Sequence, residues 1–177
     1  DHLTGNILGM DTLKLPFIFD ASVIKKEIAQ FSKSDYYDIC NPYVTLKTLW
    51  SKHLIEPVGR PDKLHCFLPN EALKKCPYLL TILNTFQCEN ETFRIHILDP
   101  GACIKPHIDI GYRFEDGKVR IHIPVQTNDN VQLLLYSSPV KMEAGECWYC
   151  NFHIKHEVSN NSDKPMIHLI IDCIVEV

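Results

Sequence analysis

Two histidines and one aspartate form the most informative set of side chains in the sequence. His107 and Asp109 are separated by a single residue. On a β-strand, residues i and i+2 point to the same face, so this imidazole and this carboxylate are expected side by side. His156, far along the chain, is the leading candidate for a third ligand from a distant strand. Two histidines and one carboxylate on one face of an octahedral Fe(II) leave positions for a cosubstrate and O₂, so these three are the predicted metal ligands and catalytic residues.

A second set of metal-binding side chains overlaps with the first. Cys147, Cys150, His153 and His156 have a spacing that resembles a structural zinc site. The segment with both cysteines is strand-like, and residues three apart on a strand face opposite sides, which disfavours a shared ion. A structural zinc protein stays open as an alternative.

The elements that must position these residues change in character along the chain. Apolar residues at helical spacing predict a helix over 20–31 and a second over 70–86, which Pro77 interrupts. Strands are expected over 13–19 and 44–50. Short strand-like runs separated by turn residues then cover Phe93–Asp99, Lys118–Val125, Val131–Tyr136, Glu146–Phe152 and Met166–Val177.

This order of elements predicts a mainly β protein with N-terminal helices packed on a barrel or sandwich, because an alternation of strands and helices is missing. We expect a single domain over 1–177. Within it, residues 1–90 form a mixed part that packs on the metal-binding barrel of residues 91–177.

Composition and charge limit the classes of function. The 177 residues are 45% hydrophobic, which is enough for one domain with a core. A net charge of −4 without a long basic run argues against a nucleic-acid partner. No apolar stretch approaches the roughly 20 residues of a membrane span, and no signal-peptide pattern is seen. The eight cysteines show no disulfide framework, which predicts reduced thiols and a cytoplasmic location. The oligomeric state is not predicted.

Four stretches together resemble a known family of enzymes. They are Arg94–Asp109, Val119–Asn128, Glu143–Tyr149 and His156–Asp172. Their order and separations are similar to those of the aspartyl/asparaginyl β-hydroxylase family of Fe(II)/2-oxoglutarate-dependent oxygenases, and within it to the branch with free-proline cis-4-hydroxylases. The resemblance implies a double-stranded β-helix (a cupin or jelly-roll barrel) that uses Fe(II), 2-oxoglutarate and O₂. It places His107, Asp109 and His156 on the metal positions, and the retained carboxylate favours hydroxylation over halogenation.

The resemblance also implies where the cosubstrate binds. Arg120 and His122 fall on positions that help to hold 2-oxoglutarate in family members, and an arginine fork suits a carboxylate. Family members usually carry a second arginine ten residues after the distal histidine. That position is Met166 here, and a thioether cannot pair with a carboxylate. The candidate substitutes are His96, Lys164 and His168. The alternative is a degenerate, non-catalytic metal-binding barrel.

The substrate is predicted only as a class. Because the family acts on Asp and Asn side chains in proteins and on free amino acids, we expect hydroxylation of an unactivated C–H bond in a small-molecule amino acid or a peptidyl residue. The candidate substrate-binding residues are Trp50, Arg60, Arg113 and Trp148.

Overall fold

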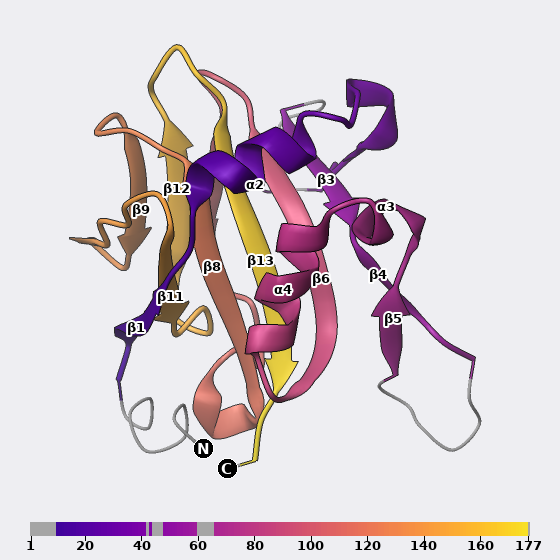
Figure 1. Cartoon of the computed structure of the whole chain (residues 1–177). Coiled ribbons are helices and arrows are strands. Elements are labelled where there is room, and N and C mark those ends of the chain that lie inside the picture. Colours follow the sequence, from indigo (N-terminus) through magenta and orange to yellow (C-terminus); the bar gives the residue numbers. More distant parts are fainter. Residues whose placement is uncertain (1–9, 42, 44–47, 60–65, 177) are drawn as a thin grey trace.

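The computed structural model describes residues 10–41, 43, 48–59 and 66–176. Its framework is a large antiparallel sheet facing a smaller one (Figure 1). The strands of the large sheet are β1 (Thr12–Ile18), β2 (Tyr37–Asp38), β3 (Leu49–His53), β6 (Glu89–Leu98), β8 (Lys118–Gln126), β11 (Glu146–Cys150) and β13 (Met166–Ile174). They lie in the order β1-β11-β8-β13-β6-β3-β2, so β13 is flanked by β8 and β6.

The small sheet carries the metal-site segments. Its strands are β7 (Cys103–His107), β9 (Val131–Leu135), β10 (Ser138–Pro139) and β12 (His156–Asn160), in the order β10-β9-β12-β7. A separate ribbon pairs β4 (Ile55–Pro57) with β5 (Phe67–Pro69). Because β7 and β12 are neighbours, residues nearly 50 positions apart in sequence lie side by side.

Three α-helices cover the outer face of the large sheet (Figure 1). They are α2 (Ala21–Ile28), α3 (Glu71–Lys74) and α4 (Pro77–Thr85), and the 3₁₀ turns are η1 (Lys33–Asp35) and η2 (Phe114–Asp116). Asp20 caps α2, since its Oδ1 accepts the backbone N–H groups of Ser22 and Val23 at 3.0 and 3.3 Å. Pro77 begins α4, where its missing N–H removes no helical hydrogen bond.

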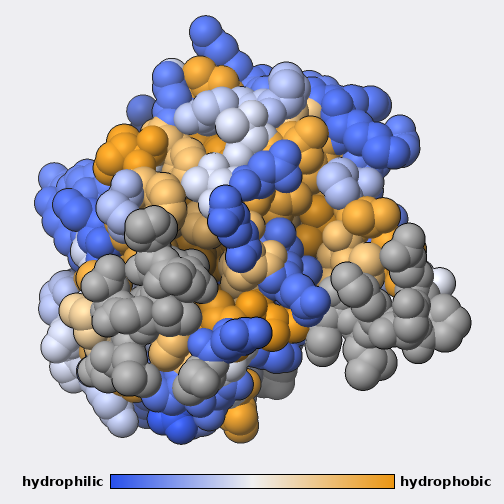
Figure 2. Space-filling view, turned by 60° about the horizontal axis from the view of Figure 1, so that its bottom comes forward, coloured by the Kyte–Doolittle hydropathy of each residue, from blue (hydrophilic) through white to orange (hydrophobic). Residues whose placement is uncertain are grey.

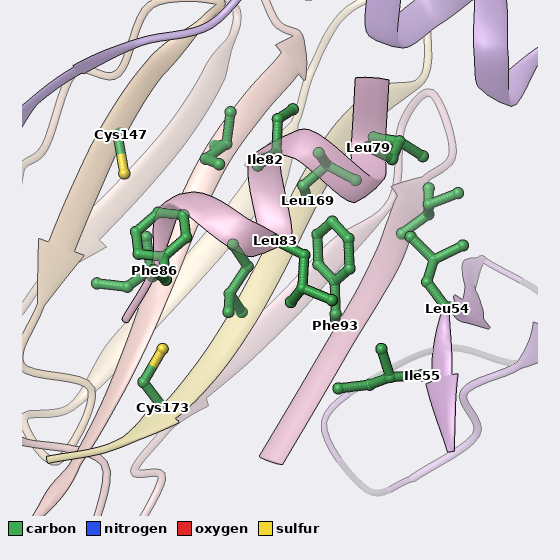
Figure 3. Packing of buried hydrophobic residues seen from close by; sticks show 14 of the residues in the cluster. Leu54, Ile55, Leu79, Ile82, Leu83, Phe86, Phe93, Cys147, Leu169 and Cys173 are labelled. Atoms are coloured by element: carbon green, nitrogen blue, oxygen red, sulfur yellow. The ribbon is translucent and has the colours of Figure 1, made fainter. Parts of the chain in front are cut away.

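The main core lies between these helices and the large sheet (Figure 3). Leu79, Ile82 and Leu83 of α4 point toward the sheet, where Phe93 and Leu169 are fully buried. Each such side chain contributes about 1.5–3 kcal/mol through burial. Alternate residues of the central strands supply the sheet side of this core, which follows from the period of two in a strand.

The residues in between point away from the helices and toward the small sheet, and many of them are polar. In β8, Val119, Ile121 and Ile123 are in the helix-side core, whereas Arg120 and His122 line a cavity on the other side. The sheet therefore separates an apolar core from a charged interior cavity.

Figure 2 shows hydrophobic and hydrophilic residues interspersed over one outer face of the molecule.

The predicted fold class is confirmed, and several boundaries differ. The chain is mainly β with few helices, and the first predicted helix ends three residues earlier than expected, at Ile28. The strands β7 and β12 were not predicted as separate elements, and 44–47 of the expected 44–50 strand lie outside the described residues. The N-terminal part also contributes β1, β2 and β3 to the large sheet instead of only packing on it.

None of the helices in the described part of the chain has the length and apolar character of a membrane span. All eight cysteines are free thiols in the structure.

Candidate metal centre

The side chains of His107, Asp109 and His156 converge at one end of the cavity. Their ligand atoms all lie within 4.8 Å of one another, and they are the single such group among the described histidine, cysteine, aspartate and glutamate residues. Nε2 of His107 is 3.5 Å from Oδ1 of Asp109, and Nε2 of His156 is 3.5 Å from Oδ2. Two ligands at about 2.1 Å from an octahedral ion stand about 3 Å apart, so little movement is needed for all three to share one ion.

Backbone carbonyls orient both imidazoles. Nδ1 of His107 lies 2.8 Å from the carbonyl oxygen of Lys105, and Nδ1 of His156 lies 2.8 Å from that of Ile154. Because a carbonyl only accepts, each Nδ1 donates a proton to it, and each Nε2 faces Asp109. This is the arrangement in which an imidazole binds a metal through Nε2.

The local structure of the pair differs from the expected strand. The strand β7 ends at His107, so Asp109 lies in the turn that follows and not on the same strand face. Its backbone N–H donates to the carbonyl of Phe152 at 2.9 Å, which holds the turn against the segment before β12. His156 is the first residue of β12 and lies opposite His107 in register. The pairing of β12 with β7 therefore brings the two histidines together. The predicted third ligand thus comes from a strand that is distant in sequence.

Arg120 connects the metal centre to a buried carboxylate. Its Nη1 donates to Oδ2 of Asp109 at 2.9 Å, while Nε and Nη2 fork onto Asp172 at 2.7 and 3.0 Å. Burial raises the pKa of Asp109, but the hydrogen bond from His156 and the charge of Arg120 outweigh it, and the pKa lies below its usual value. Burial likewise raises the pKa of Asp172, and Arg120 brings it below normal. Arg120 thus orients a predicted metal ligand, and each of its three nitrogens already donates to a carboxylate.

Three more histidines line the same cavity. Nδ1 of His122 and Nδ1 of His168 are 2.9 Å apart, and Nε2 of His96 accepts a hydrogen bond from Nε of Arg94 at 2.9 Å. Burial lowers the pKa of His168 to about 4, and burial is also the main cause that lowers the pKa values of His96 and His122. These imidazoles are therefore neutral near pH 7.

Arg94 and Asp172 were missed by the sequence reasoning. Arg94 lines the cavity, and its Nη1 lies 3.5 Å from Oδ2 of Asp172. A signal was present, because Arg94-Ile95-His96 repeats the arginine–isoleucine–histidine pattern of residues 120–122. An arginine that alternates with buried isoleucines in a strand points to the polar face of the sheet.

The cavity has a volume of about 810 Å³, within the range of roughly 300–1,000 Å³ that small-molecule sites occupy. Of the residues predicted to bind iron or cosubstrate, all but Lys164 line it. Lys164 is exposed in the turn before β13. Apolar side chains form much of the wall, and Met166 belongs to an apolar cluster with Leu49 and Leu98.

The predicted substrate-binding residues that the structure describes do not line this cavity. Arg113 pairs with Asp116 at 2.7 Å on the surface, and Trp50 donates from Nε1 to Asp99 at 3.1 Å beside a separate shallow hollow. Trp148 donates from Nε1 to Glu146 and packs on a small apolar cluster. Arg60 lies outside the described residues.

The alternative zinc site is not formed. Cys147 lies in the helix-side core, and Cys150 belongs to a different apolar cluster on the other side of β11. Burial raises the pKa of the Cys150 thiol to about 12, and that of Cys147 also lies far above normal. His153 instead accepts the backbone N–H of Gly111 through Nδ1 at 3.2 Å. The two thiols cannot share an ion, because the sheet separates them.

Comparison with known proteins agrees with this geometry. A 2-oxoglutarate–Fe(II) oxygenase-family oxidoreductase from Burkholderia pseudomallei is similar in structure, with a TM-score of 0.63 and 13% identity over 92% of this chain and 85% of that one. A prolyl-4-hydroxylase from Pseudomonas putida has a TM-score of 0.55 and 13% identity over 96% of this chain and 95% of that one. A viral collagen prolyl hydroxylase from Paramecium Bursaria Chlorella virus-1, solved with 2-oxoglutarate, has a TM-score of 0.53 and 11% identity over 96% of this chain and all of that one.

At these identities the structural similarities establish the fold, a double-stranded β-helix. The family assignment comes from the sequence. Residues 20–175 match the family model described as aspartyl/asparaginyl beta-hydroxylase, which is most of the chain. The chain therefore belongs to the aspartyl/asparaginyl β-hydroxylase family of Fe(II)- and 2-oxoglutarate-dependent oxygenases.

Proposed function

We propose that the protein hydroxylates an unactivated C–H bond of an amino acid, free or within a peptide, with an Fe(II) held by His107, Asp109 and His156. The observation that carries this proposal is the convergence of two Nε2 atoms on one half-buried carboxylate. Both Nδ1 atoms are engaged by backbone carbonyls, so each ring presents Nε2 to the point that the carboxylate also faces. The donor set is the facial arrangement that suits Fe(II).

The chain's own residues hold and shield the reaction site. Fe(II), when bound with 2-oxoglutarate, supplies the activation of O₂ and the oxidising power for C–H cleavage. Arg120 fixes the orientation of Asp109 through its Nη1, so the carboxylate is kept ionised and in place. His122 and His96 line the cavity beside the metal centre and are proposed to contact 2-oxoglutarate. The apolar walls limit the access of water to the reacting atoms.

The substrate class follows from the size and rim of the cavity. About 810 Å³ leaves room for a second small molecule or an inserted side chain beside 2-oxoglutarate. Asp38, Asp129 and Glu143 lie at the cavity with a single rim lysine, Lys141. An excess of carboxylates suits the ammonium group of a free amino acid or a basic peptide. We propose an amino acid or an amino-acid residue as substrate on this basis.

The experiment begins with anaerobic protein, Fe(II) and 2-oxoglutarate. A visible charge-transfer absorption is expected, and after O₂ is admitted the protein should form succinate and add one oxygen atom to a member of an amino-acid and peptide panel. His107→Ala and Asp109→Ala should lose the absorption, whereas His53→Ala, which alters a histidine outside the cavity, should keep it. Absorption without succinate from any panel member would favour the non-catalytic barrel. An unchanged His107→Ala variant would refute the ligand assignment.

A further inference from the structure

The cations of the cavity are already paired. Arg120 contacts Asp172 and Asp109, and Arg94 lies 3.5 Å from Asp172. At the rim, Lys141 pairs with two carboxylates, at 3.1 and 3.8 Å. No other lysine or arginine lines the cavity among the described residues. A bound metal ion would compensate the carboxylate next to it. The carboxylate far from the metal would still need a positive charge nearby, since burying an uncompensated charge is costly.

His122 and His168 form a hydrogen-bonded imidazole pair that can supply this charge. Their Nδ1 atoms are 2.9 Å apart, so one Nδ1 carries a proton and the other accepts it. The accepting ring then has its own proton on Nε2, and the donating ring has a free lone pair on Nε2. One added proton would occupy that lone pair without breaking the bond between the rings. The pair would then be a cation with two outward N–H donors.

His96 is less suited to take the proton. Its Nε2 accepts the hydrogen bond from Arg94, so protonation there would break this contact and place two cations together. Its Nδ1–H remains a donor in the neutral state. His168 and His96 are directly opposite each other on β13 and β6, and His122 lies in the next row on the same face, opposite Ile170.

A buried hydroxyl lies in the row of His96 and His168. Ser51 of β3 lies opposite His96, is fully buried, and its Oγ has no hydrogen-bond partner among the described residues. Buried polar atoms without a partner are rare in folded proteins and call for an explanation. Ser51 does not itself line the cavity, but an anion bound at His96 would place acceptors in the same row of the sheet.

We propose that the His122–His168 pair takes up one proton when the dianionic cosubstrate binds and then serves as the cation for the carboxylate far from the metal. The proton comes from solvent or buffer and adds to the free Nε2 lone pair. This inference rests on the proposed use of 2-oxoglutarate. It explains how a chain with Met166 in an apolar cluster can hold a second carboxylate.

The charged groups around the pair are balanced before the ligand arrives. Arg94 and His96 face it from β6 and Arg120 from β8, and Asp172 of β13 pairs with both arginines. Asp109, His156 and His107 line the same cavity at the metal centre, whereas His53 of β3 lies opposite Arg94 and does not line the cavity. The two arginines and two aspartates cancel, so burial dominates and keeps both rings neutral. A carboxylate within hydrogen-bonding distance favours the charged form and reverses this preference.

Isothermal titration calorimetry on Ni(II)-loaded protein tests the proposal without turnover. 2-Oxoglutarate and 2-oxobutyrate, which lacks the far carboxylate, are each titrated at pH 8 in HEPES and in Tris, whose ionisation enthalpies differ. Both carboxyls of 2-oxoglutarate are ionised at this pH. We expect it to take up between about half and one proton more than 2-oxobutyrate, and its Kd to rise by up to about tenfold per pH unit from pH 7 to 9. Equal proton uptake for both ligands would overturn the inference.

A double variant identifies the proton acceptor. His122→Asn combined with His168→Asn keeps polar atoms near both Nδ1 positions but cannot take up a proton. It should bind 2-oxoglutarate at least tenfold more weakly at pH 7 with no extra proton uptake, whereas His53→Asn should behave as the wild type. Extra uptake that persists in the double variant would exclude the pair as acceptor. Wild-type protein that binds neither 2-oxo acid would instead refute the proposed function, a result distinct from binding without proton uptake.

Discussion

Asp172→Asn should destabilise the protein more than any surface charge change, because the buried carboxylate of Asp172 contacts both Arg120 and Arg94. Its side chain is 2% exposed, and it accepts two hydrogen bonds from Arg120 and one from Thr92 at 2.8 Å. The asparagine amide nitrogen would present hydrogens to one of these donors. Removing one partner of a buried ion pair costs about 3–5 kcal/mol, and we expect the lower part of this range because Asp109 still pairs with Arg120.

Urea unfolding followed by circular dichroism measures this change. With a slope of about 2 kcal/mol per M, a loss of 3–4 kcal/mol lowers the unfolding midpoint by roughly 1.5–2 M. Asp129→Asn is the matched control, because the pair that Asp129 forms with Lys141 is exposed and worth about 0–1 kcal/mol. Metal affinity should also fall, by up to about tenfold, because Arg120 would keep its contact with Asp109 but lose the carboxylate that fixes its orientation. Equal midpoints for the two variants would refute the network as a source of stability.

Three further predictions concern the scaffold. Gly145→Ala should destabilise by more than about 1 kcal/mol, because Gly145 has φ +87° and a Cβ would clash with the backbone oxygen of Phe19. Gly59→Ala, in open space, is the control in the same thermal melt. Ile82→Ala should cost about 2–5 kcal/mol in urea unfolding, whereas Ile18→Ala at a 74% exposed position should cost little. The pKa of Asp172 is lowered on folding, so its contribution to stability is complete above the unfolded pKa of about 4 and is lost as pH falls through the folded pKa. Urea midpoints measured from pH 6 to 3 should therefore fall less in Asp172→Asn than in the wild type.

Local sequence patterns predicted the elements whose signal is strong. The central strands β8 and β13 carry long alternating or apolar runs, and the helices begin at residues with a capping side chain or a proline. The metal-ligand hypothesis placed its residues on strands, but the bounds of β7 and β12 were not predicted, because each has five residues and β7 contains Pro106 and mostly polar or half-exposed positions. Their pairing depends on the large sheet opposite, which a local pattern does not contain.

The metal ligands were predictable in type and only partly in geometry. The one-residue spacing of His107 and Asp109 suggested a shared strand face, but β7 ends at His107. The turn after β7 places the carboxylate of Asp109 near the imidazoles of His107 and His156. The pairing of Arg120 with Asp172 was hidden, because it follows from the register of β8 with β13. The position of Lys164 was also hidden, because β13 begins only at Met166 and Lys164 lies in the exposed turn before it.

The position of β13 between β8 and β6 explains how one cavity can contain fixed and variable charge. Asp172 receives Arg120 from β8 and lies 3.5 Å from Arg94 of β6, so its charge is compensated from both sides and remains fixed. Four residues earlier, His168 contacts His122 of β8 and lies opposite His96 of β6, so this row holds neutral groups that can gain a proton. The fixed row holds the carboxylate that faces the metal. The titratable histidines lie nearer the Met166 end of β13, where we propose that the second carboxylate of 2-oxoglutarate binds.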